Sequence, residues 1–348
     1  MIREFPGVTL HRGDCLDVMR SIEAGSVDAV VTDPPYGLAF MGKSWDHGVP
    51  GVEFWQAALT TAKPGAFLAA FGGTRTFHRL AVAIEDAGWE IRDTLCWHYG
   101  TGFPKSKACL KPGWEPVILA KSPGKVRELG IDECRIGTTV ETWPKTRAWP
   151  IDSRDLHARY VGSETRTVSA GNAPPGRWPS NVLLTHSPEC NGTCADGCPV
   201  KIIGEQGHEM GSHSAGAYRD EPGGGIDSSS KLVYSGGIGK NLKGFRVGDS
   251  GSVARFFYTS KASRAERGED NTHPTVKPIA IMEWVTKLIC PPGGTVLDPF
   301  IGSGTTALAA LNTGRKCIGI ERDEGYYGIA CRRVAEALDK TALLNPIA

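Results

Sequence analysis

The sequence predicts an α/β protein built on a mostly parallel sheet with helices on both faces. Short apolar strands alternate with amphipathic helices in the first third of the chain and again in the last quarter, an alternation typical of parallel sheets. In each region a turn-rich motif directly follows a buried strand. The 348 residues include 44 glycines and 23 prolines, an excess that indicates long loops and argues against a helical bundle.

The first region is expected to begin its sheet at residues 27–32 (VDAVVT). This short, β-branched apolar run has the pattern of a strand buried on both faces. Residues 67–71 (FLAAF) follow a Lys-Pro-Gly turn, and residues 74–87 have helical apolar spacing that ends at Gly88. Two further strands are expected over residues 90–99 and 115–120.

The last region repeats the alternation of helix and strand. An amphipathic helix over 278–289 precedes a strand over 295–298. A helix over 305–312 is followed by Gly314, a typical helix-ending residue. A strand over 316–320 and a closing helix over 326–338 complete the predicted core.

Residues 122–255 have a different texture. They are rich in glycine, proline, serine and threonine and show little periodicity, and residues 203–253 alone contain 13 glycines. A structureless stretch of this length inside a compact domain is usually functional or becomes ordered on binding. We therefore interpret 122–255 as an insertion between two halves of one core, residues 1–121 and 256–348.

Composition excludes several classes of protein. The chain has 39 basic and 38 acidic residues, so it is not uniformly basic, although residues 231–267 carry a net charge of +6 and residues 1–60 a net charge of −4. No apolar run reaches the length of a membrane span, and the first residues do not resemble a secretory signal. Ten cysteines are too few for a disulfide scaffold, so a reducing cytoplasm is expected.

A glycine-rich turn, residues 297–304 (LDPFIGSG), joins a predicted strand to a predicted helix. Gly302 and Gly304 would let a ligand approach the backbone at the start of that helix. Glu321, at the end of the next strand, is placed to bind ribose hydroxyls. Asp298 would repel a pyrophosphate but suits a cationic amino-acid group, which favours S-adenosylmethionine over a dinucleotide. A tightly packed turn without a ligand is the alternative.

The strand over 27–32 runs into Asp33-Pro34-Pro35-Tyr36. The prolines fix the backbone and lack N–H donors, so nearby carbonyls can act as acceptors beside the Asp33 carboxylate. These acceptors and the Tyr36 ring suit an exocyclic amine on a nucleobase, whose nitrogen becomes more tetrahedral and better able to attack a methyl group. The alternative is an ordinary strand-ending turn.

Together the two motifs resemble those of the amino-group DNA methyltransferases of the β group, which modify N6 of adenine or N4 of cytosine. The resemblance covers residues 8–121 and 255–338. It includes the junction 273–278 (HPTVKP) and residues 97–106, a segment typical of phage and prophage members. It implies a Rossmann-like AdoMet-dependent methyltransferase fold with a mostly parallel seven-stranded sheet, one antiparallel strand and an irregular inserted target-recognition region. The two motif-bearing strands would lie side by side.

The resemblance also implies roles for single residues. The catalytic positions would be Asp33, Pro34, Pro35 and Tyr36. The residues that hold S-adenosylmethionine would come from both ends of the chain: Asp14, His273, Thr275, Lys277, Asp298, Phe300, Gly302, Ser303, Gly304, Thr305 and Glu321.

The function implied is methyl transfer from S-adenosylmethionine to N6 of adenine at a specific sequence in double-stranded DNA. The target base would be flipped out and methylated by direct displacement. Cytosine N4 is the nearest alternative, and an RNA or protein methylase, a nucleotide-binding oxidoreductase and a non-catalytic DNA-binding protein are more distant ones. A homodimer and a separately encoded cognate restriction enzyme are open as partners.

His186, Cys190, Cys194 and Cys198 recur at intervals of four in a segment with too many prolines and glycines for a helix. Four soft or borderline ligands in a turn-rich loop indicate a tetrahedral structural zinc site. Chance clustering is the alternative. His208, His213 and Cys134 are substitute ligands, and the other cysteines are expected to be small buried hydrophobes: positions 15, 96, 109, 290, 317 and 331.

Target recognition is assigned to residues 122–255, with the basic segment 231–267 suited to phosphate contacts. Four further side chains there could contact DNA, but packing within the insertion is the favoured interpretation for each: Trp143, Trp149, Arg177 and Trp178.

Overall fold

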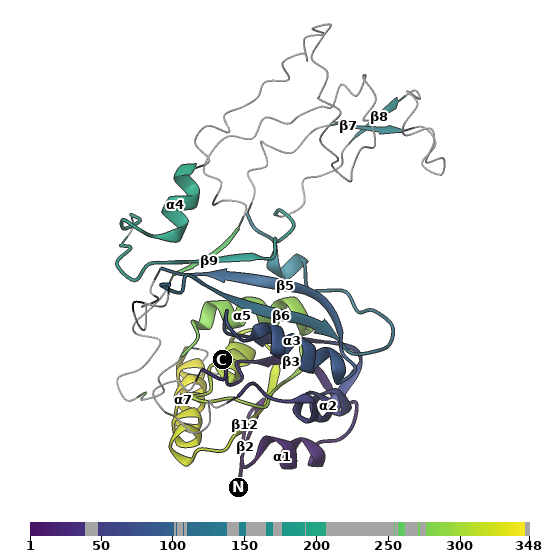
Figure 1. Ribbon diagram of the computed structural model, residues 1–348, viewed down its shortest axis with the longest axis vertical. Coiled ribbons are helices and arrows are strands. Elements are labelled where there is room, and N and C mark those ends of the chain that lie inside the picture. The colour runs from purple at the N-terminus through teal and green to yellow at the C-terminus, as the bar shows by residue number, and fades with distance from the viewer. Residues whose placement is uncertain are drawn as a thin grey trace, which may run out of the picture.

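The computed structural model describes residues 1–38, 48–100, 102, 107, 110–137, 146–150, 165–169, 176–191, 193–206, 254, 257–261, 271 and 276–344. Within them a ten-stranded sheet runs through the lower part of the molecule in the view of Figure 1. Its strands are β1 (Ile2–Phe5), β2 (Val8–Arg12), β3 (Val27–Thr32), β4 (Ala62–Phe71), β5 (Glu90–His98), β6 (Trp114–Lys121), β9 (Val182–His186), β10 (Tyr258–Lys261), β11 (Thr295–Asp298) and β12 (Lys316–Glu321).

The strand order is β1-β2-β12-β11-β3-β4-β6-β5-β9-β10. The middle seven strands, from β2 to β5, confirm the predicted arrangement, because only β6 runs antiparallel to its neighbours among them. The expected total of seven strands was too low. An antiparallel β1 extends one edge, and β9 and β10 extend the other in parallel with β5.

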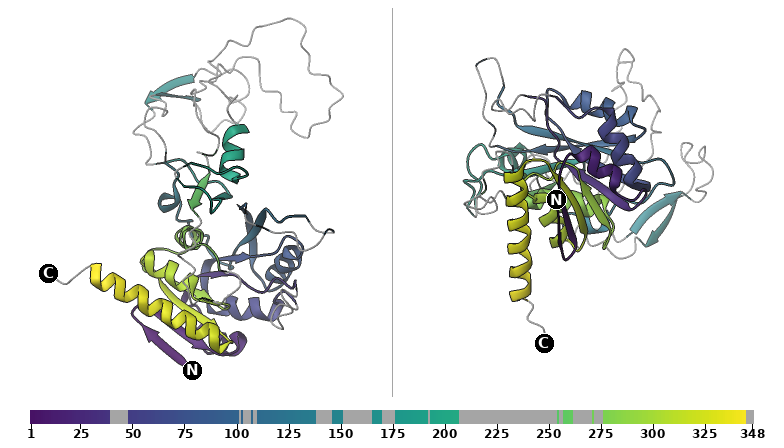
Figure 2. Two further views of the ribbon diagram at one scale, coloured as in Figure 1. Left: turned by 90° about the vertical axis from the view of Figure 1, so that its left-hand side faces the viewer. Right: turned by 90° about the horizontal axis from the view of Figure 1, so that it is seen from below.

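Helices cover both faces of this sheet. Helices α1 (Cys15–Ser21), α2 (Val52–Thr61) and α3 (Phe77–Asp86) pack against one face through Cys15, Met19, Trp55, Leu80 and Ile84. Apolar side chains of α5 (Ile279–Ile289), α6 (Thr305–Asn312) and α7 (Glu324–Leu344) pack against the other face. Helix α7 lies against β1, β2 and β12 (Figure 2). No helix in the described ranges is long and apolar enough to cross a membrane. The remaining helix that the structure describes, α4 (Pro199–Gln206), lies within residues 122–255.

The segment predicted as an insertion is only partly separate from the core. Strand β9 lies within residues 122–255, yet it pairs with β5 in the main sheet, because its three central residues are apolar or small and buried. Strands β7 (Thr146–Pro150) and β8 (Thr165–Ser169) form a separate antiparallel pair. The Ile136 amide donates to the Arg177 carbonyl, and the Arg177 amide donates to the Ile136 carbonyl. These two hydrogen bonds hold Ile136 and Arg177 side by side, although they are far apart in the sequence.

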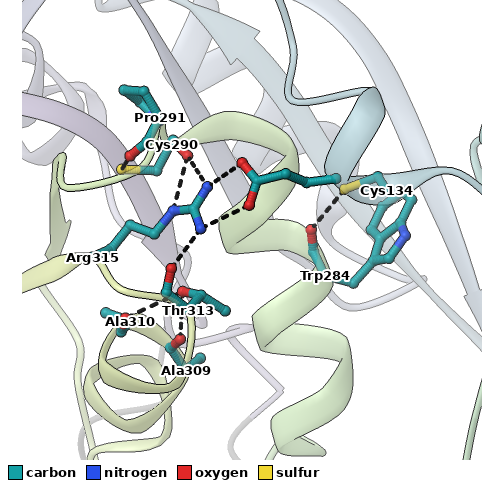
Figure 3. Close-up of polar contacts among 9 residues, drawn as sticks. Cys134, Trp284, Cys290, Pro291, Ala309, Ala310, Thr313 and Arg315 are labelled. Carbon is teal, nitrogen blue, oxygen red and sulfur yellow. Dashed lines mark hydrogen bonds and ion pairs between the residues drawn. The ribbon is translucent and has the colours of Figure 1, made fainter.

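A buried arginine holds the start of this segment to the core (Figure 3). The Arg315 guanidinium is almost wholly buried and donates to both carboxylate oxygens of Glu133, at 2.6 and 3.0 Å. It also donates to the carbonyl oxygens of Cys290 and Thr313. In the same turn the Cys134 thiol donates to the Trp284 carbonyl at 3.5 Å, so Cys134 belongs to the core.

Candidate functional site

The two motifs meet because their strands are neighbours. Strands β3 and β11 pair in parallel, so both motif loops leave the same edge of the sheet. The Thr32 hydroxyl donates to Oδ1 of Asp298 at 2.7 Å and so joins the last residues of the two strands directly. Segments more than 260 residues apart in the chain therefore form one site.

Four side chains form a closed polar network beside the first motif, which we call the lysine cluster: Asp33, Tyr36, Glu115 and Lys277. The Tyr36 hydroxyl lies 2.8 Å from Oδ1 of Asp33 and 3.0 Å from Oε2 of Glu115. The Lys277 ammonium lies 2.8 Å from Oδ2 of Asp33 and 3.2 Å from Oε2 of Glu115. One ammonium thus sits between two carboxylates, and a phenol bridges them.

Burial and aromatic rings reinforce this network. The Lys277 side chain is 8% exposed, and its ammonium lies 5.3 to 5.9 Å from the ring centres of Tyr36, Phe71 and Trp97, within cation–π range. Burial alone would lower the pKa of Lys277, but the carboxylates of Asp33 and Glu115 outweigh it and raise that pKa. Lys277 therefore stays charged at neutral pH.

The same surroundings affect Tyr36. Burial, followed by the negative charges of Asp33 and Glu115, raises the pKa of its phenol well above the ordinary value. The Thr76 hydroxyl donates to the Tyr36 carbonyl at 2.7 Å. A Cβ added at Gly73 would lie 3.2 Å from the Tyr36 ring, so the loop after β4 fixes this tyrosine from one side.

Lys277 was expected to help close the cofactor pocket; the structure instead pairs it with Asp33 and Glu115. Its predicted companions His273 and Thr275 lie outside the described residues. Pro34 is buried and Pro35 half-buried. Both follow Asp33 in the loop that leaves β3, as predicted.

Asp298 supports the second motif from inside the protein. Its carboxylate is buried and accepts hydrogen bonds from Thr32, from the Thr306 hydroxyl at 2.5 Å and from the Phe300 amide at 3.0 Å. Burial raises the pKa of Asp298 to about 7, although these hydrogen bonds act against the rise. These hydrogen bonds hold the glycine turn in shape, and the expected proximity of Asp298 to a cationic ligand group stays a prediction.

The turn itself has the predicted form. Gly302 and Gly304 have φ angles of 53° and 86°, in the left-handed region that favours glycine. The Gly302 amide donates to Oε2 of Glu321 at 3.0 Å, so the carboxylate at the end of β12 lies against the turn. The side chains of Ser303 and Thr305 face elsewhere, toward the Arg333 guanidinium of α7.

Asp14 and Phe300, two further residues predicted to bind the cofactor, lie close to β12 and the glycine turn. The Asp14 carboxylate caps α1 by accepting from the Leu16 amide at 2.9 Å. The adjacent Gly13 amide donates to the Glu321 carbonyl, which holds Asp14 near the end of β12. The Phe300 ring lies 6.0 Å from that of Phe54.

Glu115 and Tyr99 were missed by the sequence analysis. The Tyr99 hydroxyl donates to Oε1 of Glu115 at 3.2 Å, which supports the lysine cluster from outside. A usable signal existed: β6 is antiparallel to β4, so the first residues of β6 lie at the edge where the parallel strands end. A charged residue at that end of a largely apolar strand is a site candidate.

The residues predicted to bind metal also come together. His186, Cys190, Cys194 and Cys198, here called the cysteine–histidine cluster, place one ligand atom each within 4.8 Å of all the others. Of the substitute ligands, Cys134 is buried among core residues, and His208 and His213 lie outside the described residues. Apart from Cys109, which also lies outside them, the remaining cysteines are buried or half-buried, as predicted.

Trp178 departs from its predicted packing role. Its side chain is 68% exposed, and the Arg135 guanidinium lies 5.7 Å from its ring centre. Trp143 and most of the basic segment 231–267 lie outside the described residues, as does the side chain of Trp149. Only Trp178 of the Trp178–Arg135 pair is exposed, because Arg135 is mostly buried and paired with Asp132.

The chain is similar to several known methyltransferases. The M.ScaI type II methyltransferase of Streptomyces caespitosus is 48% identical over 80 residues, which is 23% of this chain and 26% of that protein. The chain spans about a quarter of the length of the curated relatives it matches. Among solved structures, the M1.HpyAVI–SAM complex matches at 17% identity and a TM-score of 0.47, covering 94% of this chain and 98% of the other. The cytosine-N4-specific PvuII DNA methyltransferase matches at 15% identity and a TM-score of 0.48, covering 98% and 93%.

The family comparison extends much further along the chain. A model of the N6/N4 DNA methylases matches residues 27–332. This stretch begins at β3, includes both motifs and the segment between them, and ends within α7. The chain therefore belongs to the N6/N4 DNA methylase family.

Proposed function

We propose that this protein transfers a methyl group from S-adenosylmethionine to an exocyclic amine of double-stranded DNA, with N6 of adenine as the target. The observation that carries the proposal is the junction of the lysine cluster and the glycine turn at one sheet edge, linked by the Thr32–Asp298 hydrogen bond. The reaction needs an acceptor set for an amine beside a nucleoside-binding turn, and the proximity of the two motifs supports the proposal.

The second motif fits S-adenosylmethionine by its chemistry. The left-handed glycines leave the backbone of the turn accessible, and Glu321 supplies a carboxylate for ribose hydroxyls. Asp14 and Phe300 would contribute at the adenine end and beside the turn. When bound, the cofactor supplies an activated methyl group, and Asp298 keeps the turn in its binding shape.

The first motif would hold the target amine. The Asp33 carboxylate has two oxygens with spare lone pairs beyond the contacts from Tyr36 and Lys277. One of them and a carbonyl of the Pro-Pro segment can accept both N–H groups of an amine. Lys277 balances the charge of Asp33 and holds it in place, and the Tyr36 ring offers a stacking surface for a flipped base.

Residues 122–255 would supply sequence recognition. Three features support this role: the basic segment 231–267, the exposed Trp178 with Arg135, and the pairing of β9 with β5, whose Trp97 faces Lys277. Phosphate contacts by such a segment would make DNA binding strongly salt-dependent. A homodimer and a separately encoded restriction enzyme stay predictions.

The experiment that tests the function identifies the modified base. The protein is incubated with isotope-labelled S-adenosylmethionine and unmethylated double-stranded DNA, which is then digested to nucleosides for mass spectrometry. We expect labelled N6-methyladenine. Labelled N4-methylcytosine would replace the adenine assignment, and unlabelled DNA from folded, cofactor-binding protein would refute the proposal.

A further inference from the structure

The cysteine–histidine cluster has the dimensions of a metal site. Nδ1 of His186 lies 3.4 Å from Sγ of Cys194 and 3.6 Å from Sγ of Cys198, and all four ligand atoms lie within 4.8 Å of one another. In a tetrahedral zinc site with zinc–sulfur bonds of about 2.3 Å, neighbouring ligand atoms are about 3.8 Å apart. Small side-chain movements would therefore complete the tetrahedron.

The backbone around the cluster is folded to bring the four residues together. His186 ends β9, and the Cys190 amide donates to the Ser187 carbonyl, closing a turn between the first two ligands. The Ala195 amide donates to the Cys190 sulfur at 3.3 Å. Amide donors of this kind orient metal-bound thiolates and stabilise their charge.

The surroundings give the cluster little other reason to hold its shape. The apolar core around it has only five buried members among the described residues, and two of them are ligand cysteines. Disulfides cannot explain the arrangement, because three thiols cannot all pair with one another, and all three are free. A metal would supply the folding energy that such a small core lacks.

We propose that His186, Cys190, Cys194 and Cys198 bind one zinc ion in a closed structural site. Thiolates and imidazole favour zinc over magnesium or calcium. Four protein ligands leave no open coordination position, which is typical of structural rather than catalytic zinc.

The site would also brace the end of β5. A Cβ added at Gly100, two residues beyond that strand, would lie 2.8 Å from Oγ of Ser187 and 3.3 Å from Cδ of Pro199. The Trp97 indole of β5 donates to the Thr185 hydroxyl of β9 at 2.7 Å. The segment that carries the cysteine–histidine cluster therefore packs closely against β5. The Trp97 ring of β5 in turn faces the Lys277 ammonium.

The first test measures metal content. Protein purified without chelators is analysed by inductively coupled plasma mass spectrometry, and about one zinc per chain is expected. Cys194→Ser should lose the zinc, whereas the matched control Cys96→Ser, which removes a half-buried cysteine of β5, should keep it. Iron in place of zinc, or folded protein without metal, would overturn the proposal.

A second measurement uses the unaltered chain, in case Cys194→Ser fails to fold. Replacing the metal with cobalt should give the intense visible bands of a tetrahedral ion and a thiolate-to-cobalt band in the near ultraviolet. Bands of octahedral cobalt, or none, would refute the site. Neither measurement depends on methyl transfer. A failure of the zinc proposal can therefore be told apart from a failure of the proposed function.

Discussion

The lysine cluster and the cysteine–histidine cluster are both compact groups of titratable side chains, but they are completed in different ways. In the lysine cluster an ammonium lies between two carboxylates, and every member has a partner within the group. In the cysteine–histidine cluster, three thiols and an imidazole, all of them groups that can bind a metal, face one another. This difference fits the two proposals: the first cluster already contains its cation and would accept a neutral amine, whereas the second would be completed by a metal ion.

The largest expected effect comes from removing the carboxylate of the lysine cluster that would touch the amine. Asp33→Ala should lower methyl transfer by about 1,000-fold or more, because a preorganised acceptor at the reacting atom is lost. Single-turnover assays measure the rate, and calorimetry should show S-adenosylmethionine binding largely unchanged. Asp17→Ala, at an exposed position of α1, is the control. Full activity of Asp33→Ala would contradict the catalytic assignment.

Removing the ammonium tests whether the lysine cluster depends on charge balance. Lys277→Met should lower the free energy of unfolding by about 3–5 kcal/mol, because two carboxylates are left facing each other without a cation. Urea denaturation followed by circular dichroism measures the loss. Adding Glu115→Gln should recover part of it, and Arg20→Met, at an exposed ion pair, should have little effect. Wild-type stability of Lys277→Met would show that the cluster is not held by charge.

Asp298 predicts a pH dependence of stability. Its pKa is about 7 in the folded chain, so between about pH 4 and pH 7 the unfolded chain loses this proton while the folded chain keeps it. The free energy of unfolding should therefore fall as the pH rises through this window, by at most about 4 kcal/mol, and level off above it. Asp298→Asn should remove this slope in urea titrations at pH 5 and pH 8, and Asp17→Asn should retain it. Identical slopes in all three proteins would refute the prediction.

The smallest effect separates the ring of Tyr36 from its hydroxyl. Tyr36→Phe keeps the stacking surface and removes one hydrogen-bonding group, which should slow methyl transfer by about fivefold to tenfold. Tyr36→Ala should lose more activity, because the ring is removed as well. Single-turnover rates compare the two, and equal rates would mean that the ring contributes nothing.

Much of the core was predictable because its signals are local. The bounds of β3, β11 and α6 agree with the sequence analysis, since each is a short apolar run beside a proline or glycine turn. Strands β1 and β2 and helices α1 and α2 were not anticipated. In β1 most residues are exposed, so it lacks the apolar pattern of a buried strand.

The site was predictable where one motif supplies its own geometry. Two features were predictable in this way: the turn at Gly302 and Gly304, and the convergence of the four residues of the cysteine–histidine cluster. The pairing of Lys277 with Asp33 could not be predicted, because the two residues are 244 positions apart and only the fold brings them together. The hydrogen bonds from Thr32 and Thr306 to Asp298 were likewise not predictable, since no local pattern reveals them.

The paired backbone hydrogen bonds between Ile136 and Arg177 have an engineering consequence. They close the base of a loop, and the Glu133–Arg315 ion pair fixes that base to the core. Because the entropy of closing a loop grows only slowly with its length, residues 137–176 can be exchanged as a cassette with little cost to the core. Under the proposed function, exchanging the segment between these two anchors tests whether it contributes to DNA recognition, because the lysine cluster lies outside it.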